Sequence, residues 1–231
     1  MKYPSFKTAF WLIFILIISM QIIQVIYSLQ VYGWNVDSYP PKYYLHLDLF
    51  SIGWYIASVI LVGFSFSLQN LSAHIFYNFN FDFLRKYFIQ TIKYFGGAAL
   101  AVLTLSFIFP EPEFYIDENS VIMNVLAVFV TVIMAPVCEE LVFRGYLYSA
   151  MIPVFKRKKE RLVVNAMLFA SAHVFFVSFV FGEPVPFYIF ILGYLIAKLY
   201  EESRSVLPGI LLHLLNNGLV VIIDFIKTDL N

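Results

Sequence analysis

Charged residues are scarce in this chain. Asp, Glu, Lys and Arg make up 13% of the 231 residues, whereas 61% are hydrophobic. Soluble domains contain about one quarter charged and about one half apolar residues. The composition therefore excludes an ordinary soluble domain and is typical of a protein that resides in a lipid bilayer.

Cysteine is almost absent, because Cys138 is the only one in the chain. A single thiol excludes an internal disulfide framework and a zinc site built from several cysteines. The sequence also contains no HExxH, GxSxG, GxGxxG or Walker motif, so the usual signatures of zincins, serine hydrolases and nucleotide-binding enzymes are missing. We interpret the basic run KRKKER (156–161) as a topology anchor at the membrane surface and expect no nucleic-acid partner.

Long charge-free stretches recur along the chain. Most of them reach the roughly 17 to 25 residues that a helix needs to cross hydrocarbon. We therefore predict an all-α fold, a polytopic transmembrane helical bundle with about seven spans. The predicted spans are residues 8–36, 49–81, 94–110, 121–138, 162–182, 184–197 and 206–223.

Lysine and arginine residues are concentrated in alternate connections between these spans. They cluster before the first span and after the second, fourth and sixth, whereas the loop EPEFYIDENS (111–120) is purely acidic. By the positive-inside rule, the N-terminus is cytoplasmic and the C-terminus lies outside. Residues 71–92 mix aromatic with polar and charged side chains, so we predict an amphipathic segment in the cytoplasmic interface.

Polar side chains interrupt the last spans at similar depths. At a helical rise of about 1.5 Å per residue, the depths are about 16 Å for Glu139, His173 and Asn217, and about 10 Å for His213. Ionisable groups in hydrocarbon cost several kcal/mol, so they normally face the bundle interior or a wet cavity. We expect three helices to deliver these groups to one polar pocket.

Spacing within each helix suggests partners. Glu140 and Arg144 are four residues apart and can form an ion pair that only fixes packing. Glu139 has Phe143 at the equivalent position, so its carboxylate stays available. Asn217 shares a face with His213, four residues before it, and could simply hydrogen-bond a neighbouring helix.

A glutamate and two histidines in such a pocket suit two kinds of hydrolytic site. The carboxylate can take a proton from water while an imidazole orients that proton, and His213 with Asn217 could donate hydrogen bonds to an oxyanion. Alternatively, Glu139, His173 and His213 form a His2Glu zinc set with an open fourth position. These residues alone leave both alternatives open.

Three motifs resemble those of a known family. EELVFRG (139–145), FASAH (169–173) and HLLNN (213–217) are similar to the EExxxR, FxxxH and HxxxN motifs of the CPBP family of intramembrane proteases. That family includes the Rce1-type CAAX prenyl proteases and bacterial Abi proteins linked to bacteriocin immunity. The resemblance covers roughly residues 121–217, and it divides the chain into N-terminal transmembrane helices with the interfacial segment (1–118) and a catalytic helical core (119–231).

The resemblance implies a role for each motif residue. Glu139 would activate water with His173 as its partner, and His213 with Asn217 would stabilise the oxyanion. Glu140 and Arg144 would be supporting residues. We favour a metal-free site because no fourth fixed ligand is evident; a divalent metal such as zinc, if present, would be held by Glu139, His173 and His213.

These expectations define a leading hypothesis and two rivals. The leading hypothesis is a multi-pass endopeptidase of the cell membrane, acting on a membrane-anchored or lipidated substrate such as a prenylated CAAX protein. One rival is a non-enzymatic immunity or regulatory protein of the same fold. The other is a proton-coupled transporter, because Glu and His chains also relay protons.

Overall fold

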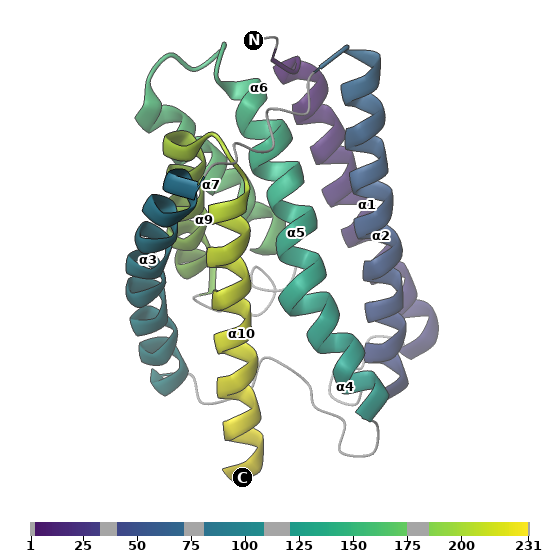
Figure 1. The fold of residues 1–231 in the computed structure, drawn as a ribbon. Helices are drawn as coiled ribbons and strands as arrows, with labels where there is room; N and C mark the ends of the chain where they lie inside the picture. The colour runs from purple at the N-terminus through teal and green to yellow at the C-terminus, as the bar shows by residue number, and fades with distance from the viewer. Residues whose placement is uncertain (1–2, 33–40, 72–80, 109–120, 175–184, 231) are drawn as a thin grey trace.

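The computed structural model describes residues 3–32, 41–71, 81–108, 121–174 and 185–230. This part of the chain is helical and contains no strand, which confirms the predicted all-α class (Figure 1). The helices are α1 (Phe6–Tyr32), α2 (Pro41–Leu68), α3 (Phe81–Ile108), α4 (Val121–Val128), η3 (Phe129–Met134), α5 (Ala135–Glu140), η4 (Leu141–Tyr148), α6 (Ser149–Met151), α7 (Lys158–Val174), α9 (Val185–Ser203) and α10 (Leu207–Leu230).

Four helical stretches in the described residues are long and apolar enough to cross a membrane, judged by length and composition. They are Ser51–Leu68, Arg85–Leu105, Val121–Met151 and Leu207–Lys227. Large apolar side chains cover the outside of the bundle; Phe107, for example, is 90% exposed. Such a surface requires lipid around it. Several predicted spans extend beyond the described residues, so the count of seven stays a prediction.

The predicted interfacial segment needs revision. Within residues 71–92, positions 72–80 lie outside the described part of the chain. Helix α3 begins at Phe81, and its apolar stretch begins at Arg85. Residues 81–92 therefore continue directly into a candidate span instead of forming a separate surface helix.

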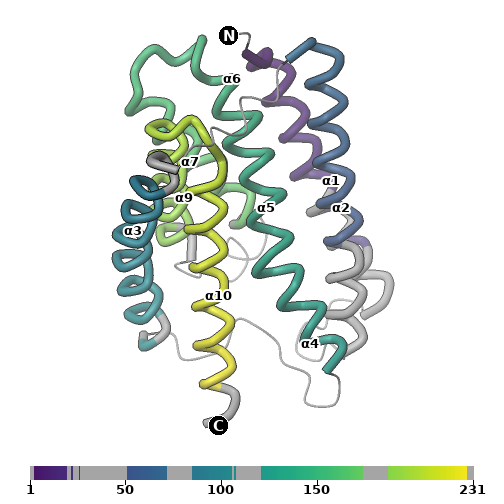
Figure 2. Tube along the Cα trace, in the orientation of Figure 1, coloured from purple at the N-terminus to yellow at the C-terminus, as the bar shows by residue number. Residues whose placement is uncertain are grey.

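A single helical rod, built from α4, η3, α5, η4 and α6, runs through the bundle (Figure 2). It contacts α2 on one side and α10 on the other. The rod contains two π-helical stretches, η3 and η4; at the end of η3 the Ala135 N–H donates to the Val130 carbonyl, five residues earlier. Pro136 follows immediately and has no N–H to donate. Wider turns of this kind occur frequently at functional sites.

The basic connections gather at one end of the bundle. The N-terminus, the turn between α6 and α7 and the turn between α9 and α10 all lie at the top of Figure 1, and the C-terminus lies at the bottom. This arrangement agrees with the alternation of basic residues along the sequence. Which end faces the cytoplasm stays a prediction.

Polar contacts join three helices at this basic end. The Arg161 guanidinium of α7 lies 2.7 Å from Glu201 of α9, and Gln90 of α3 donates to Glu202 at 2.6 Å. Although partial burial raises the pKa of Glu202, the hydrogen bond from Gln90 and the nearby Lys158 ammonium lower it below its usual value. Glu202 is therefore a stable anion that ties α9 to α3 and α7.

The turn from α9 to α10 determines where His213 lies. Helix α9 ends where Arg204 takes a positive φ of 55°, a conformation common at helix C-termini. The Ser205 hydroxyl then accepts a hydrogen bond from the Leu207 N–H at 3.3 Å and caps α10. Pro208 lies in the first turn, where its missing N–H has no cost. Helix α10 thus begins at a defined residue, and His213 enters the bundle interior.

Candidate active site

Glu139, in α5, is the centre of a polar cluster inside the bundle. The Tyr55 hydroxyl of α2 donates to Glu139 Oε1 at 2.9 Å. On the other oxygen, Glu139 Oε2 lies 3.3 Å from His173 Nε2 of α7. The Glu139 side chain is only 12% exposed. Two helices far apart in the sequence therefore converge on the two oxygens of one carboxylate.

The tautomer of His173 follows from its second contact. His173 Nδ1 lies 2.8 Å from the Phe169 carbonyl oxygen, which can only accept a hydrogen bond. Nδ1 therefore carries a hydrogen, and in the neutral ring Nε2 presents a lone pair to Glu139. A hydrogen bond between Nε2 and Oε2 then requires a proton on one of the two groups.

His213, in α10, connects the two glutamates. Its Nδ1 lies 3.0 Å from Glu140 Oε1, and its Nε2 lies 4.0 Å from Glu139 Oε2. Because a carboxylate accepts, Nδ1 carries a hydrogen and Nε2 faces Glu139. The structure thus brings Glu139, His173 and His213 together from three helices, as the depth argument predicted.

Glu140 and Arg144 form a fully buried ion pair. Arg144 Nη1 donates to Glu140 Oε1 at 2.8 Å, and neither side chain has exposed surface. Arg144 Nη2 donates to the Gly193 carbonyl of α9 at 3.0 Å. The guanidinium carbon lies 4.2 Å from the centroid of the Phe169 ring, within cation–π range. The predicted pair therefore exists, and it also ties the rod to α7 and α9.

Gly209 lets α10 approach the buried glutamate closely. A Cβ at this position would lie 2.8 Å from Ile196 Cγ2 and 3.3 Å from Glu140 Oε2. Ile196 has no exposed surface, and Glu140 is held by Arg144 and His213, so neither neighbour can move away easily.

We expect Gly209→Ala to lower the thermal unfolding midpoint of the purified protein, because overpacking a filled interior costs about 1–3 kcal/mol. Gly97→Ala is the matched control: this glycine lies within α3 with no atom within 4 Å of an added Cβ. The control should be neutral or slightly stabilising, since Ala favours helix over Gly. Equal midpoints for the two variants would contradict the close approach.

Asn217 lies outside the hydrogen-bonded cluster. Its Nδ2 donates to the Thr131 carbonyl of η3 at 2.9 Å, and its Oδ1 accepts from Asn216 at 3.4 Å. Asn217 and His213 lie on the same face of α10, but among the described residues they have different hydrogen-bond partners. Asn217 instead holds α10 against the π-helical stretch that precedes Glu139.

The donor atoms do not fit a metal centre as they stand. Within the described ranges, no group of three or more His, Cys, Asp or Glu side chains has an arrangement that could hold a metal ion. We therefore derive no step through a metal from Glu139, His173 and His213.

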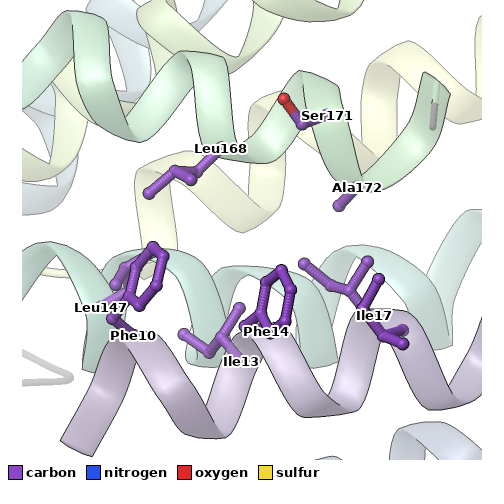
Figure 3. Close-up of a pocket in the computed structure, with 9 residues that line it drawn as sticks. Phe10, Ile13, Phe14, Ile17, Leu147, Leu168, Ser171 and Ala172 are labelled. Carbon is purple, nitrogen blue, oxygen red and sulfur yellow. The ribbon is translucent and has the colours of Figure 1, made fainter. Parts of the chain in front are cut away.

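An apolar cavity of about 230 Å³ lies between α1 and α7 (Figure 3). Its walls are almost entirely hydrocarbon. They consist of Phe10, Ile13, Phe14, Ile17, Ile18, Leu147, Leu168, Ser171 and Ala172. Ser171 and Ala172 immediately precede His173 in the sequence, but Glu139, His173 and His213 are not among the lining residues.

The comparison with protein families agrees with the geometry. A family model described as "Type II CAAX prenyl endopeptidase Rce1-like" matches residues 121–219. These residues are therefore similar to Rce1-like endopeptidases, and we call them the Rce1-like domain. The resemblance noted over residues 121–217 is thereby confirmed, and the described family supports a peptidase. No curated protein and no solved structure matches the chain.

The three helices that carry Glu139, His173 and His213 belong to the Rce1-like domain, but Tyr55 does not. Tyr55 precedes Glu139 by 84 residues and lies in α2, before the matched region begins. Sequence reasoning missed it because it sits in an apolar run beside Trp54 and Ile56, where an aromatic residue normally indicates packing. Its position relative to the motifs carries no spacing signal.

Proposed function

We propose that the protein is an intramembrane endopeptidase that hydrolyses a peptide bond of a membrane-associated, CAAX-type substrate. The observation that carries this proposal is the position of the Glu139 carboxylate inside the bundle. Its Oε2 is buried, faces His173 and has no hydrogen-bond partner among the described residues. A carboxylate oxygen held in this way can accept a proton from water, and the Rce1-like domain supports peptide hydrolysis as the reaction.

In the proposed reaction, a water molecule lies between Glu139 Oε2 and the substrate carbonyl. The water oxygen attacks the carbonyl carbon while its proton passes to Oε2, which gives a tetrahedral intermediate. Glu139 then returns the proton to the leaving nitrogen as the C–N bond breaks, leaving a carboxylic acid and an amine. His173 Nε2, 3.3 Å from Oε2, orients this proton throughout.

His213 is proposed to stabilise the oxyanion of that intermediate. For this role Nε2 must carry a hydrogen, so the ring must be doubly protonated. The Glu140 carboxylate, 3.0 Å from Nδ1, fixes the orientation of the ring, so that Nε2 faces Glu139. Asn217 is proposed as the second donor, through the amide hydrogen that does not engage Thr131.

The proposed setting is the cell membrane, with seven spans and a cytoplasmic N-terminus. Residues 119–231 would form the catalytic core, and residues 1–118 would supply the remaining transmembrane helices. A lipid anchor on the substrate would concentrate its cleavage site at the bilayer. The arrangement of basic connections at one end of the bundle supports this topology.

A direct test uses purified protein in detergent with a fluorogenic, prenylated CAAX-type peptide. We expect the wild-type protein to cleave it and His173→Ala to lose about 10²- to 10⁴-fold in kcat/KM, the usual contribution of a general acid–base partner. A parallel reaction with a chelator should proceed unchanged, because the proposed water activation uses Glu139 and His173 and no metal ion.

Other outcomes would contradict the proposal. An uncut peptide panel, with correctly folded protein, would favour an immunity or regulatory protein that acts by binding. A pH-dependent ion flux in liposomes that His173→Ala abolishes would favour a transporter. Loss of cleavage on chelation would contradict the metal-free mechanism and leave the peptidase in place.

A further inference from the structure

The two oxygens of Glu139 have different surroundings. Oε1 accepts the hydrogen bond from the Tyr55 hydroxyl at 2.9 Å. Oε2 faces His173 Nε2 and His213 Nε2 at 3.3 and 4.0 Å and has no hydrogen-bond partner among the described residues. One oxygen is thus anchored and the other is available for chemistry.

The Tyr55 side chain is itself held firmly. It is 8% exposed and packs with Val130, Ala135 and Cys138 of the rod. Its ring contacts the Trp54 ring edge-on, with centroids 5.3 Å apart. A phenol fixed in this manner delivers its hydroxyl to one point and can donate only one hydrogen bond.

Within the described residues, the Tyr55 hydroxyl is the hydrogen-bond donor to Glu139 Oε1, whereas His173 approaches the other oxygen, Oε2, at 3.3 Å. The neighbouring Glu140 is fixed by a charged partner, Arg144, and by His213. Glu139 has Phe143 in the corresponding position, so its Oε1 is fixed by the neutral phenol and not by a cation. A neutral donor orients a carboxylate without forming an ion pair that would compete with proton transfer.

We propose that Tyr55 is a positioning residue for the water-activating glutamate, a role that rests on the proposed function. Its hydroxyl holds Oε1 and thereby turns Oε2 toward the two histidines. Helix α2, outside the Rce1-like domain, then contributes directly to the reaction geometry. The N-terminal helices are accordingly part of the catalytic unit and not only a membrane anchor.

The chain offers a matched control for this proposal. Tyr146, in η4, has no exposed surface, and its hydroxyl hydrogen-bonds Ser65 of α2. It therefore makes the same kind of link between α2 and the rod, but it does not touch Glu139. Replacing either tyrosine by phenylalanine removes one buried hydroxyl between the same two elements.

We expect Tyr55→Phe to lower kcat for peptide cleavage by about ten- to a hundredfold, the usual effect of losing a hydrogen bond to a charged group. KM should change by less than about twofold, because Tyr55 acts on the base and not on substrate binding. Tyr146→Phe should lower the thermal unfolding midpoint by a similar amount to Tyr55→Phe and leave kcat near the wild-type value. Equal kcat values for the two variants would overturn the proposal.

A second measurement does not need turnover. In protein labelled with ¹³C at the glutamate carboxyl, subtracting the infrared spectrum of Glu139→Gln isolates the Glu139 band. The same difference spectrum is then recorded with Tyr55→Phe added to both the Glu139 and the Glu139→Gln protein, and again with Tyr146→Phe added to both. The Glu139 band should shift with Tyr55→Phe and stay in place with Tyr146→Phe. No shift with Tyr55→Phe overturns the positioning role whatever the activity. A shift in a protein that cleaves no peptide supports the contact with Glu139 and refutes the proposed function.

Discussion

Glu139→Gln is expected to lower kcat/KM for peptide cleavage by about 10³- to 10⁴-fold, at the upper end for loss of a general base. The glutamine amide has nearly the same shape and retains an oxygen that can accept from Tyr55, but it cannot take a proton from water. The measurement is steady-state cleavage of the prenylated peptide by detergent-purified protein, with an unfolding midpoint recorded for each variant.

The control for this experiment is the same substitution at an exposed site. Glu160 lies at the start of α7, and in the described part of the chain its ion pair is a surface contact of 3.6 Å with Arg157. Such pairs contribute little, so Glu160→Gln should keep wild-type activity and stability. A Glu139→Gln protein that retains a tenth of the wild-type activity would show that another group activates the water.

Arg144→Leu is expected to destabilise the folded protein by about 3–5 kcal/mol, because it leaves Glu140 buried without its cation. The loss would be read from the unfolding midpoint in detergent. Arg144 also donates to the Gly193 carbonyl, so the substitution removes a second buried hydrogen bond. No comparable loss is expected for Arg157→Leu, whose ion pair with Glu160 is exposed.

A double variant separates charge from packing in this prediction. Glu140→Met with Arg144→Leu removes both charges and should recover part of the stability, because replacing a whole buried pair is often close to neutral. The recovered protein should still be inactive, since His213 loses its acceptor at Nδ1. A double variant less stable than Arg144→Leu alone would contradict the assignment of the loss to an uncompensated charge.

The convergence of Glu139, His173 and His213 could be predicted because two physical constraints determine it, the rise of a helix and the cost of exposing an ionisable group to lipid. Helices advance by a fixed rise, and hydrocarbon penalises any ionisable group that does not face the interior. Depth along each span was therefore sufficient to place the three side chains in one layer. Glu140 and Arg144 were predictable for a similar reason, since a spacing of four residues brings side chains together on one helix.

The contacts of Asn217 could not be predicted in the same way. Its partner is a backbone carbonyl, that of Thr131, within the π-helical stretch η3. A π turn adds a residue to the turn and rotates everything that follows, and hydrophobic periodicity does not reveal it. The same limitation applies to residues 81–92, whose polar side chains suggested a surface segment although the backbone continues as α3.

The position of the buried ion pair has a consequence for the biogenesis of the protein. Glu140 and Arg144 lie on the same rod, so they can neutralise each other as soon as that segment leaves the ribosome and enters the membrane. The partners of Glu139 on α7 and α10 are synthesised later. The Glu140–Arg144 pair can therefore be matched during insertion, whereas Glu139 acquires both histidines only after α10 has been synthesised.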